Sequence, residues 1–495
     1  MSSTTTLRTQ ATHVESAEST SGRSLLQENG FVEQGTSSDD EVEPHPLGVR
    51  PSGNALTSDQ NAQESMGGFR FLPDGLLVTL LEFLDAAALL NLGATCRGFY
   101  AYCTYDQLWR DVAVNDTNER FEWRGSWRAS LLRLPPTTRL AKVDCRYVFS
   151  DALYRPFQCS RTPLGPYVSN IPLQNEIPRL KDVSPEEFND SWVGRPFILT
   201  APVKKWRVFE TWDLQHLLAK YGHVSFRCEA VDWPLTTYVG YMESSQDESP
   251  LYLFDRAFVE KMGLQDAYEP PEAFQEDFFT LLKDQRPDRR WLIIGPERSG
   301  STFHKDPNAT SAWNAIIRGS KYWIMFPSSI LPPGVYMSQD QSEVTSPLSI
   351  AEWLLSYHAE ARAMSGCLEG ICREGEVLHV PSGWWHLVVN LEPAIAITQN
   401  FVPRAHVPST IRFLRDRADQ VSGFSDKVAD PYALFMERLK ETDPDLVVSL
   451  DDSRKRKWEE VVAGNEEANG EQHGFSFGFS DDLDEAEEPS DSSGL

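Results

Sequence analysis

The chain has 495 residues, of which 40% are hydrophobic and 11% aromatic, which is enough to bury a sizeable core in more than one domain. Its formal net charge of −27 at pH 7 opposes direct binding to the phosphate backbone of nucleic acids. The charge favours cationic protein partners, although acidic tails also serve simply to keep a chain in solution. The seven cysteines are odd in number and include no C-x-x-C pair, so the sequence predicts reduced thiols rather than a disulfide framework or a zinc cluster.

Residues 1–68 are rich in Ser, Thr, Gly, Glu and Gln and contain few large apolar side chains. Such a composition cannot offset the entropy lost on ordering, so we expect a disordered N-terminal arm. The first residues lack the apolar run of a secretory signal, and nowhere does the chain approach the roughly 20 apolar residues of a membrane span. The sequence therefore predicts a protein that is neither secreted nor inserted in a membrane.

Residues 69–116 contain leucines at a helical spacing, and Asp85 is placed to cap the second of two leucine-rich runs. The frame of this segment consists of Leu72-Pro73, Leu80-Leu81, Phe83-Leu84, Leu89-Leu90, Leu92, Thr95-Cys96-Arg97, Phe99-Tyr100 and Leu108-Trp109-Arg110. It resembles the F-box, a short helical module by which substrate receptors dock on the Skp adaptor of cullin-RING ubiquitin ligases. The resemblance implies a Skp-type adaptor as a partner, and the alternative is an ordinary helical core.

Residues 117–190 form a connecting segment to which the sequence assigns no role. From residue 191 to 403, short apolar runs alternate with Gly, Pro and Asp, which is typical of an all-β double sheet. The clearest predicted strands are residues 291–294, 322–326 and 394–397. Apolar residues at three- and four-residue steps predict helices at residues 214–220, 272–283 and 350–360.

Two histidines and one carboxylate in this region suit a non-haem iron centre. His304 and Asp306 are two residues apart, so in an extended strand they face the same side, and His386 lies further along the chain. Two imidazoles and a carboxylate on one face of Fe(II) leave coordination positions open for a cosubstrate and dioxygen. An H-x-D pair alone is a weak signal, because a hydrogen-bonded surface histidine gives the same pattern.

The surrounding sequence makes the iron centre a stronger prediction. The informative stretches are residues 197–199 (FIL), 240–244 (GYMES), 249–255 (SPLYLFD), 311–314 (SAWN), 319–327 (GSKYWIMFP), 375–386 (GEVLHVPSGWWH) and 396–401 (AITQNF). Together they resemble the JmjC (jumonji C) family of Fe(II)- and 2-oxoglutarate-dependent oxygenases, and within it the subgroup of protein lysyl hydroxylases and arginine demethylases. The resemblance implies an α+β chain, in which the F-box precedes a double-stranded β-helix, or cupin-like jelly roll, with flanking helices.

The resemblance also implies roles for individual residues. His304, Asp306 and His386 would ligate Fe(II), with the carboxylate compensating part of the metal charge. Lys321 stands where the family places the cation that pairs with the distal carboxylate of 2-oxoglutarate. An ordinary lysine at the edge of a strand is the alternative for this position.

Four further residues are implied in binding the cosubstrate. Asn314 and Thr398 lie on the matched motifs as hydrogen-bonding neighbours of Lys321. Tyr238 would donate its phenol to the same distal carboxylate, with plain packing as the alternative. Ser301 stands three residues before the first ligand, where related chains carry a threonine, so the hydroxyl is retained and the methyl group is lost.

Beyond the oxygenase region, apolar positions between residues 404 and 452 predict helices that pack on the barrel. Residues 453–495 form an acidic tail that we expect to be disordered. The tail opens with the basic cluster Arg454-Lys455-Arg456-Lys457, which predicts nuclear import, although such a short run is also typical of a solvated face. We therefore expect a nuclear protein, with the cytoplasm as the alternative.

The implied reaction is oxidation of a protein side chain with Fe(II), 2-oxoglutarate and dioxygen. Hydroxylation of a lysine in a basic protein is the favoured outcome, because most relatives with the SAWN and GWWH motifs are similar to lysyl hydroxylases. The same metal centre acting on an N-methyl carbon would release formaldehyde, so a histone or arginine demethylase is a second reading. A third is a non-enzymatic F-box receptor whose barrel only binds a partner, which the intact ligand set disfavours.

Overall fold

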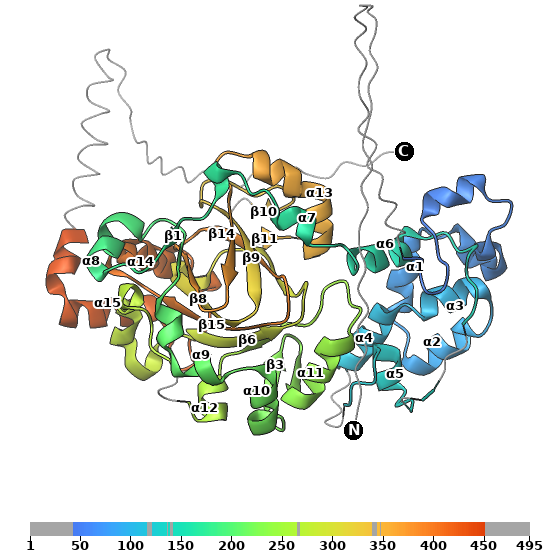
Figure 1. Ribbon diagram of the computed structural model, residues 1–495, viewed down its shortest axis with the longest axis horizontal. Coiled ribbons are helices and arrows are strands. Elements are labelled where there is room, and N and C mark those ends of the chain that lie inside the picture. The colour runs from blue at the N-terminus through green and yellow to red at the C-terminus, as the bar shows by residue number, and fades with distance from the viewer. Residues whose placement is uncertain are drawn as a thin grey trace, which may run out of the picture. The chain divides into compact units, whose positions relative to one another are not determined.

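The structure is a computed structural model that describes residues 43–115, 121–135, 137–138, 142–264, 268–338, 344–346 and 348–450 (Figure 1). The chain divides into two units, residues 1–44 and 45–495, and every described helix and strand belongs to the second. The acidic tail with its basic cluster at residues 454–457 lies outside the described residues, as do residues 1–42 of the N-terminal arm. In the described part, no helix combines the length and the apolar character needed to cross a membrane.

The last part of the expected disordered arm is ordered, which corrects the prediction for residues 45–68. Two 3-10 helices lie here, Ser52–Thr57 and Ala62–Phe71. The amide of Ala62 donates to the carbonyl of Tyr147 at 2.8 Å, and Met66 is buried against Gly98. The composition gave no sign of this, because the few apolar side chains are buried by residues distant in the sequence.

The F-box region contains four short helices that enclose a small core. They are α1 (Asp74–Leu81), α2 (Ala86–Gly93), α3 (Arg97–Cys103) and α4 (Asp106–Asn115). Asp85 caps α2 as predicted, since its carboxylate accepts a hydrogen bond from the amide of Ala88 at 2.7 Å. Trp109 of α4 is fully buried and donates its indole N–H to the carbonyl of Cys103 at 2.8 Å.

The connecting segment joins the F-box to the oxygenase through α5 (Trp127–Leu131), α6 (Asp151–Cys159), α7 (Gly165–Val168) and the single turn α8 (Pro185–Glu187). Trp127 has no exposed surface, and its indole N–H lies 3.0 Å from both carboxylate oxygens of Asp247 in the oxygenase. Its ring also packs beside Trp233 and Tyr241. The segment without a predicted role therefore contacts both modules, because the amide of Trp127 also donates to the carboxylate of Asp106 in the F-box at 3.1 Å.

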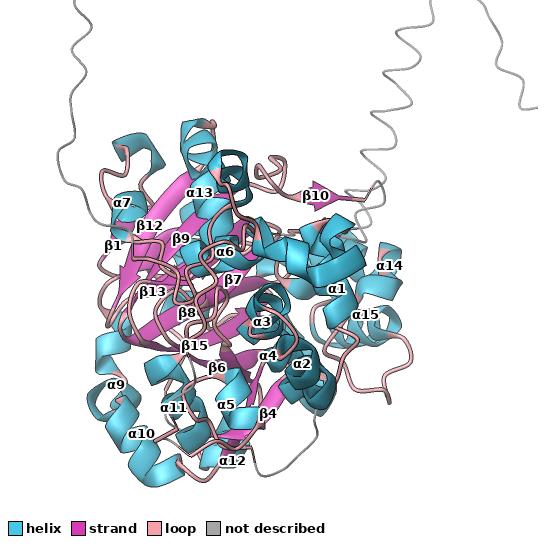
Figure 2. Ribbon diagram, turned by 90° about the vertical axis from the view of Figure 1, so that its right-hand side faces the viewer, coloured by secondary structure: helices cyan, strands magenta, loops and turns pink. Residues whose placement is uncertain are grey.

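Two opposed sheets form the barrel, as the double-stranded β-helix requires (Figure 2). In spatial order, the nine-stranded sheet consists of β1 (Arg179–Leu180), β2 (Phe197–Leu199), β13 (Val377–Val380), β8 (Ser311–Arg318), β15 (Ala394–Phe401), β6 (Arg290–Gly295), β5 (Leu253–Asp255), β3 (Ser225–Cys228) and β4 (Val231–Pro234). The four-stranded sheet consists of β12 (Leu368–Arg373), β9 (Ser320–Phe326), β14 (Trp385–Asn390) and β7 (Gly300–His304). A separate pair is formed by β10 (Tyr336–Met337) and β11 (Val344–Thr345).

Helices cover the outer surfaces of the sheets. They are α9 (Arg207–Thr211), α10 (Leu214–Tyr221), α11 (Leu235–Ser244), α12 (Phe258–Met262), α13 (Ile350–Ala363), α14 (Val407–Asp416) and α15 (Pro431–Thr442). The helices predicted at residues 214–220 and 350–360 are present as α10 and α13. Residues 272–283 instead contain two short 3-10 segments, because Lys283 has a positive φ of 52° and Asp277 caps the second segment from a non-helical position.

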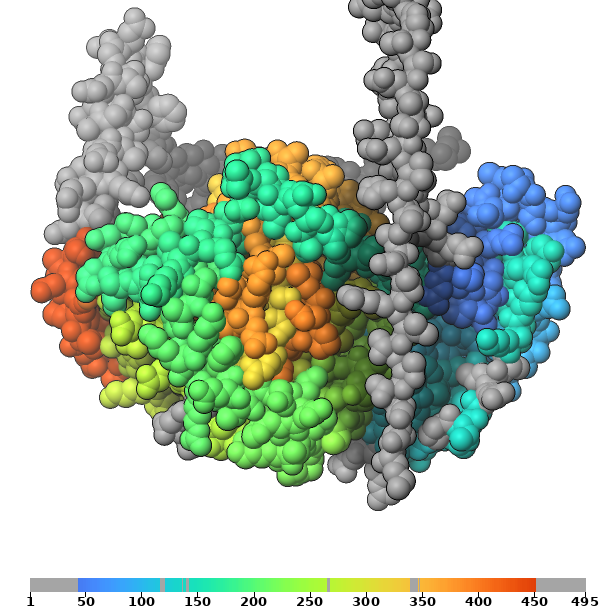
Figure 3. Space-filling view, viewed as in Figure 1, coloured from blue at the N-terminus to red at the C-terminus, as the bar shows by residue number. Residues whose placement is uncertain are grey.

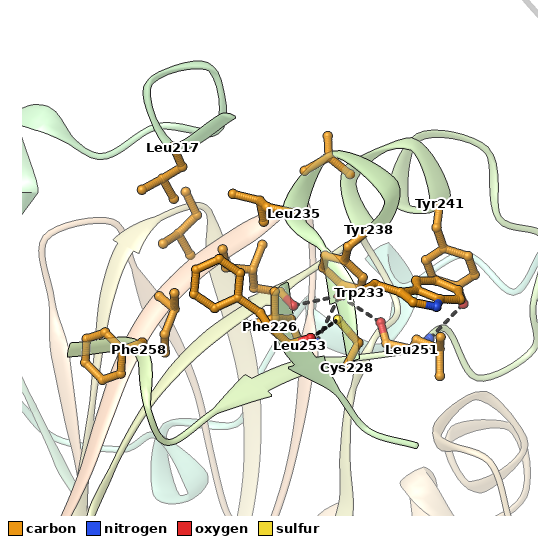
Figure 4. Close-up of a cluster of buried hydrophobic side chains, with 14 of the residues drawn as sticks. Leu217, Phe226, Cys228, Trp233, Leu235, Tyr238, Tyr241, Leu251, Leu253 and Phe258 are labelled. Carbon is orange, nitrogen blue, oxygen red and sulfur yellow. Dashed lines mark hydrogen bonds between the residues drawn. The ribbon is translucent and has the colours of Figure 1, made fainter. Parts of the chain in front are cut away.

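The fold class is confirmed as α+β, with a helical F-box before a cupin-like barrel. One apolar cluster runs from the F-box through Trp127 into the nine-stranded sheet. A part of it, where α10 and α11 pack on β3 and β5, is drawn in Figure 4. In the second unit the F-box, coloured blue, and helices α14 and α15, coloured red, lie at opposite ends (Figure 3).

Candidate metal centre

The three predicted metal ligands meet on two neighbouring strands of the four-stranded sheet. His304 ends β7 and lies opposite His386 of β14 in the antiparallel register, and Asp306 follows two residues after His304. One ligand atom from each of the three residues lies within 4.8 Å of the others. The antiparallel register places the imidazole of His386 beside that of His304. The two-residue spacing then brings the carboxylate of Asp306 to the same point.

Hydrogen bonds orient both imidazole rings for metal binding. The Nδ1 of His304 lies 2.8 Å from the carbonyl of Thr302, and the Nδ1 of His386 lies 3.1 Å from the carbonyl of Trp384. A carbonyl can only accept, so each Nδ1 carries the proton and each Nε2 keeps its lone pair for a metal. Burial, together with the neighbouring His304, lowers the pKa of His386, which keeps its ring neutral at pH 7.

The carboxylate of Asp306 also fits a metal ligand. Its Oδ2 is buried and has no hydrogen-bond partner among the described residues. Burial raises the pKa of Asp306 to about 6, against opposing contributions from His304 and from a hydrogen bond with Asn400. A buried carboxylate oxygen without a donor is costly, and a divalent cation at this point would satisfy it.

A cavity of about 190 Å³ lies beside the three ligands, inside the barrel. Because about 10–15 Å³ of such volume holds one water molecule, the cavity has room for a small dicarboxylic acid. Its lining includes Ser301, Asn314 and Thr398 among the predicted residues and Trp323 and Val388 among apolar ones. Three of the predicted cosubstrate residues are therefore next to the metal ligands.

Lys321 of β9 is a buried cation behind this cavity. Its side chain is 1% exposed, and its Nζ donates to the hydroxyl of Tyr252 at 2.6 Å. Among the described residues no carboxylate forms an ion pair with it, and burial lowers its pKa to about 7. A buried ammonium without an acidic partner is stabilised when an anion binds, which suits the carboxylate of a small acid.

Asn314 and Thr398 face each other across the β8–β15 ladder. The hydroxyl of Thr398 donates to the carbonyl of Trp313 at 2.9 Å, so its lone pairs are directed elsewhere. The Oδ1 of Asn314 is buried and has no partner among the described residues. Both side chains can therefore contact a polar ligand in the cavity.

Tyr238 does not line the cavity, so its position does not support the predicted contact with the cosubstrate. Its hydroxyl lies 2.7 Å from the carbonyl of Ile294 and 2.9 Å from that of Leu251, and it accepts a hydrogen bond from the amide of Leu253 (Figure 4). With these backbone partners the phenol is committed to fixing β5. Packing, the alternative considered for this residue, is what the structure shows.

Tyr252 occupies the place that was predicted for Tyr238. Its ring lines the cavity, and its hydroxyl contacts Lys321. The signal was present in the SPLYLFD stretch, where Leu251 and Leu253 flank Tyr252 in an alternating pattern. A second missed residue is Asn400, which lines the cavity, donates to the hydroxyl of Thr310 at 2.7 Å and hydrogen-bonds Asp306.

Comparison with known proteins agrees with this geometry. Residues 234–406 match the family described as a cupin-like domain, and residues 69–115 match the one described as F-box-like. Over 448 residues, 87% of this chain and 88% of the relative, the sequence is 34% identical to "Arginine-specific demethylase JMJ22" of Arabidopsis thaliana. The chain belongs to the JmjC oxygenase family.

Other JmjC oxygenases match the barrel region over a smaller part of the chain. "Bifunctional arginine demethylase and lysyl-hydroxylase psr-1" of Caenorhabditis elegans is 33% identical over 49% of this chain and 66% of its own length. "2-oxoglutarate and iron-dependent oxygenase JMJD4" of Homo sapiens is 27% identical over 51% of this chain and 64% of its own length. The iron and 2-oxoglutarate predicted as cofactors are those of this JmjC family, and both hydroxylases and demethylases are among the relatives.

Proposed function

We propose that this JmjC oxygenase hydroxylates a lysine side chain in a basic protein, with an F-box that docks on a Skp-type adaptor. The observation that carries the enzymatic part is the pairing of a complete His-Asp-His ligand set with a buried lysine that has no acidic partner among the described residues. A barrel that only bound a protein would gain nothing from burying these polar groups. The same observation argues against a non-enzymatic receptor.

Some of the site residues would bind the metal, and others would bind the cosubstrate. Iron and 2-oxoglutarate, when bound, would supply the chemistry that activates dioxygen, which is the oxidant for a substrate C–H bond. His304, Asp306 and His386 would hold the iron on one face. Lys321 and the hydroxyl of Tyr252 would bind the distal carboxylate of 2-oxoglutarate.

The remaining cavity residues would orient the cosubstrate and exclude water from it. Asn314 and Thr398 supply polar contacts from β8 and β15, and Ser301 supplies a hydroxyl beside the ligand His304. Trp323 and Val388 form apolar parts of the lining, which keep the local dielectric low. A low dielectric strengthens the ion pair between Lys321 and a bound carboxylate.

The protein substrate would approach from outside the cosubstrate cavity. Two larger cavities, of about 380 and 640 Å³, also reach His304, and both are lined in part by residues that lie outside the barrel interior. The net charge of −27 favours a cationic protein through long-range attraction. Lysine is the proposed target because lysyl-hydroxylase is one of the two activities in the name of the psr-1 relative, the other being arginine demethylase.

Demethylation of a histone or another arginine-methylated protein is the second candidate. It is favoured by one specific observation, the 34% identity with a relative named as an arginine-specific demethylase over nearly the whole chain. The ligand set is the same for both reactions, so only the product separates them. Basic peptides with unmodified lysine and with methylated arginine should be incubated with the protein, Fe(II) and 2-oxoglutarate and analysed by mass spectrometry.

A gain of about 16 mass units on the lysine peptide indicates hydroxylation, and a loss of about 14 on the methylated peptide indicates demethylation. The Asp306→Ala variant is the control for oxidation by free iron. Formation of succinate with neither mass change would contradict lysine hydroxylation and arginine demethylation in these peptides.

The F-box proposal rests on large apolar side chains that the described residues leave exposed. One face of α1 and α2 is buried and includes Leu77, Leu81 and Leu89, whereas other large apolar side chains of this region are exposed to water. The exposed apolar residues of this region are Phe69, Phe71, Leu76, Leu80, Phe83 and Leu90, of which Phe83 is 83% exposed. Several exposed large apolar side chains in one short segment are typical of a protein interface, and the F-box match indicates a Skp-type adaptor as its partner.

Nuclear localisation is also part of the proposal. It rests on the sequence alone, because residues 454–457 lie outside the described part of the chain. A tagged protein in which Lys455 and Arg456 are changed to alanine should shift from the nucleus to the cytoplasm. An unchanged distribution in fluorescence microscopy would contradict import through this cluster.

A further inference from the structure

The last F-box helix lies against the segment that carries Tyr252. Arg110 of α4 is only 15% exposed in its side chain, and its Nη1 donates to the carbonyl of Ser249 at 2.9 Å. The same guanidinium lies 3.5 Å from a carboxylate oxygen of Asp247 and 3.6 Å from one of Glu229. One arginine thus binds three groups of the oxygenase.

Glu229 connects Arg110 to Tyr252. One oxygen of its carboxylate faces Arg110, and the other accepts a hydrogen bond from the backbone amide of Tyr252 at 3.1 Å. Glu229 is held with a positive φ of 51°, which few non-glycine residues adopt. Its carboxylate therefore lies between the F-box and the cosubstrate cavity. The backbone of Glu229 keeps its positive φ although this conformation costs conformational energy.

Asp247 fixes the other end of the same segment. Its carboxylate accepts hydrogen bonds from the indole of Trp127 at 3.0 Å and from the hydroxyl of Tyr241 at 2.7 Å. That hydroxyl in turn accepts from the amide of Leu251 at 2.7 Å (Figure 4). The amide of Leu251 is therefore linked to Arg110 through Tyr241 and Asp247, and the amide of Tyr252 is linked to it through Glu229.

We propose that Arg110 of the F-box is a positioning residue for the 2-oxoglutarate site, acting through Glu229 and the segment 247–252 on the hydroxyl of Tyr252. Arg110 touches neither metal nor cosubstrate. Its guanidinium sets the position of the Tyr252 backbone, and the tyrosine hydroxyl then lies at hydrogen-bond distance from Lys321. The F-box would thus be a structural part of the oxygenase site as well as a docking module.

The charges of Arg110, Glu229 and Asp247 support a positioning role for Arg110. Burial raises the pKa of both Glu229 and Asp247, and Arg110 opposes the rise in each case. Without Arg110 two neighbouring carboxylates would be left close together with a poorer counter-charge, and the local structure would relax to hydrate them. A shift of the segment by a fraction of an ångström is enough to lengthen the contact between Tyr252 and Lys321.

The inference rests on the proposed cosubstrate role of Lys321 and Tyr252, so the test measures both. Full-length protein is loaded with Mn(II) in place of iron, and 2-oxoglutarate binding is measured by calorimetry. The variants are Arg110→Ala, Tyr252→Phe, the two combined, and Lys321→Ala. Arg286→Ala is the matched control, because Arg286 is 10% exposed and forms a 2.6 Å ion pair with Asp277, and neither residue lines the cavity.

Arg110→Ala should raise the Kd for 2-oxoglutarate about tenfold, as outer contacts of such sites commonly do, and should leave the affinity for Mn(II) unchanged. Tyr252→Phe should have a similar effect. The combined variant should be little worse than either single one, because both remove the same contact. Arg286→Ala should lower the melting temperature and leave the Kd unchanged.

An effect of Arg110→Ala equal to that of Arg286→Ala would overturn the inference, as would effects of Arg110→Ala and Tyr252→Phe that simply multiply. Unchanged binding in Lys321→Ala would overturn the cosubstrate assignment itself, and with it the role of Arg110. If Arg110→Ala does not fold, Arg110→Lys takes its place. A lysine keeps the charge but cannot contact Ser249, Asp247 and Glu229 together, so the Kd should still rise.

Discussion

Each of the three predicted metal ligands has local surroundings that suit metal binding. His304, Asp306 and His386 come from two strands, and each has the environment that a ligand needs: two fixed imidazole tautomers and one carboxylate oxygen without a donor. None of the three contributes much to the apolar core. Loss of one ligand should therefore affect the chemistry far more than the fold.

His304→Ala and Asp306→Ala should each lower succinate formation to below about 1% of the wild-type rate, because two ligands do not retain the metal in a productive geometry. The melting temperature of both variants should stay within a few degrees of the wild type. His216→Ala, at an exposed position on α10, is the control. Full iron binding and turnover in the two ligand variants would refute the centre.

Lys321 gives the site a pH dependence. Burial lowers its pKa to about 7, so without ligand its ammonium loses the proton near neutral pH. An anion binds to the protonated form, and the affinity for 2-oxoglutarate should therefore fall as the pH rises from 7 to 9, approaching tenfold per pH unit. The measurement is the Kd of the Mn(II)-loaded protein across this range.

Lys321→Arg is the control for this pH dependence, because a guanidinium stays charged throughout the range. The variant should bind 2-oxoglutarate with an affinity that no longer varies between pH 7 and 9, even if the affinity itself is lower. An equal slope in the wild type and in Lys321→Arg would assign the titration to another group.

At the scale of elements, the F-box helices separate their two faces clearly. Leu77, Leu81 and Leu89 point into the F-box core, whereas Leu80 and Phe83 lie in water. Substitution of the exposed pair should affect docking and leave the fold and the oxygenase untouched. The leucine spacing predicted helices, but it did not predict which leucines would be buried and which would be exposed.

Leu80→Asp combined with Phe83→Asp should abolish recovery of a Skp-type adaptor in a pull-down of the full-length protein, because two exposed apolar side chains of the proposed docking surface are replaced by charge. The change in unfolding free energy should stay within about 0.5 kcal/mol, as for most surface substitutions. Leu355→Asp is the matched control, since Leu355 of α13 is 49% exposed but lies outside the F-box. Equal recovery by both variants would show that the F-box is not the docking surface.

At the scale of the molecule, the F-box and the oxygenase share one core. The apolar cluster that contains Trp109 of the F-box continues through Trp127 to Tyr241 and Ile397 of the barrel. Residues before the F-box also contribute, since Val49 and Met66 are buried in the same cluster. Among the described residues, the F-box and the barrel therefore share one continuous apolar core rather than having a core each.

We therefore expect the F-box and the oxygenase to unfold in one transition. Trp127→Ala should lower the free energy of unfolding by about 3–5 kcal/mol, because it removes a fully buried tryptophan at the junction. Urea denaturation followed by far-ultraviolet circular dichroism and by tryptophan fluorescence tests this. Two separated transitions in the wild-type protein would show that the modules are independent.

The sequence by itself determined the features that depend on local spacing. The alternation in β7 predicts that His304 and Asp306 share a face, the leucine steps predict the helices of the F-box, and the runs of apolar residues predict β6, β9 and β15. Family resemblance added His386 and Lys321, which no local pattern connects with the first two ligands. These predictions succeed because a period of two or of 3.6 is a property of the backbone.

Only the tertiary structure decided which tyrosine meets Lys321 and what the segments outside the two motifs do. Tyr238 and Tyr252 are both aromatic residues in apolar surroundings, and the choice between them depends on the pairing of β5 with β6, a contact between distant residues. The order at residues 45–68 and the junction at Trp127 also depend on partners far away in the chain. A sequence pattern records where a side chain points along its own element, whereas burial and hydrogen-bond partners are set by whichever other element packs against it.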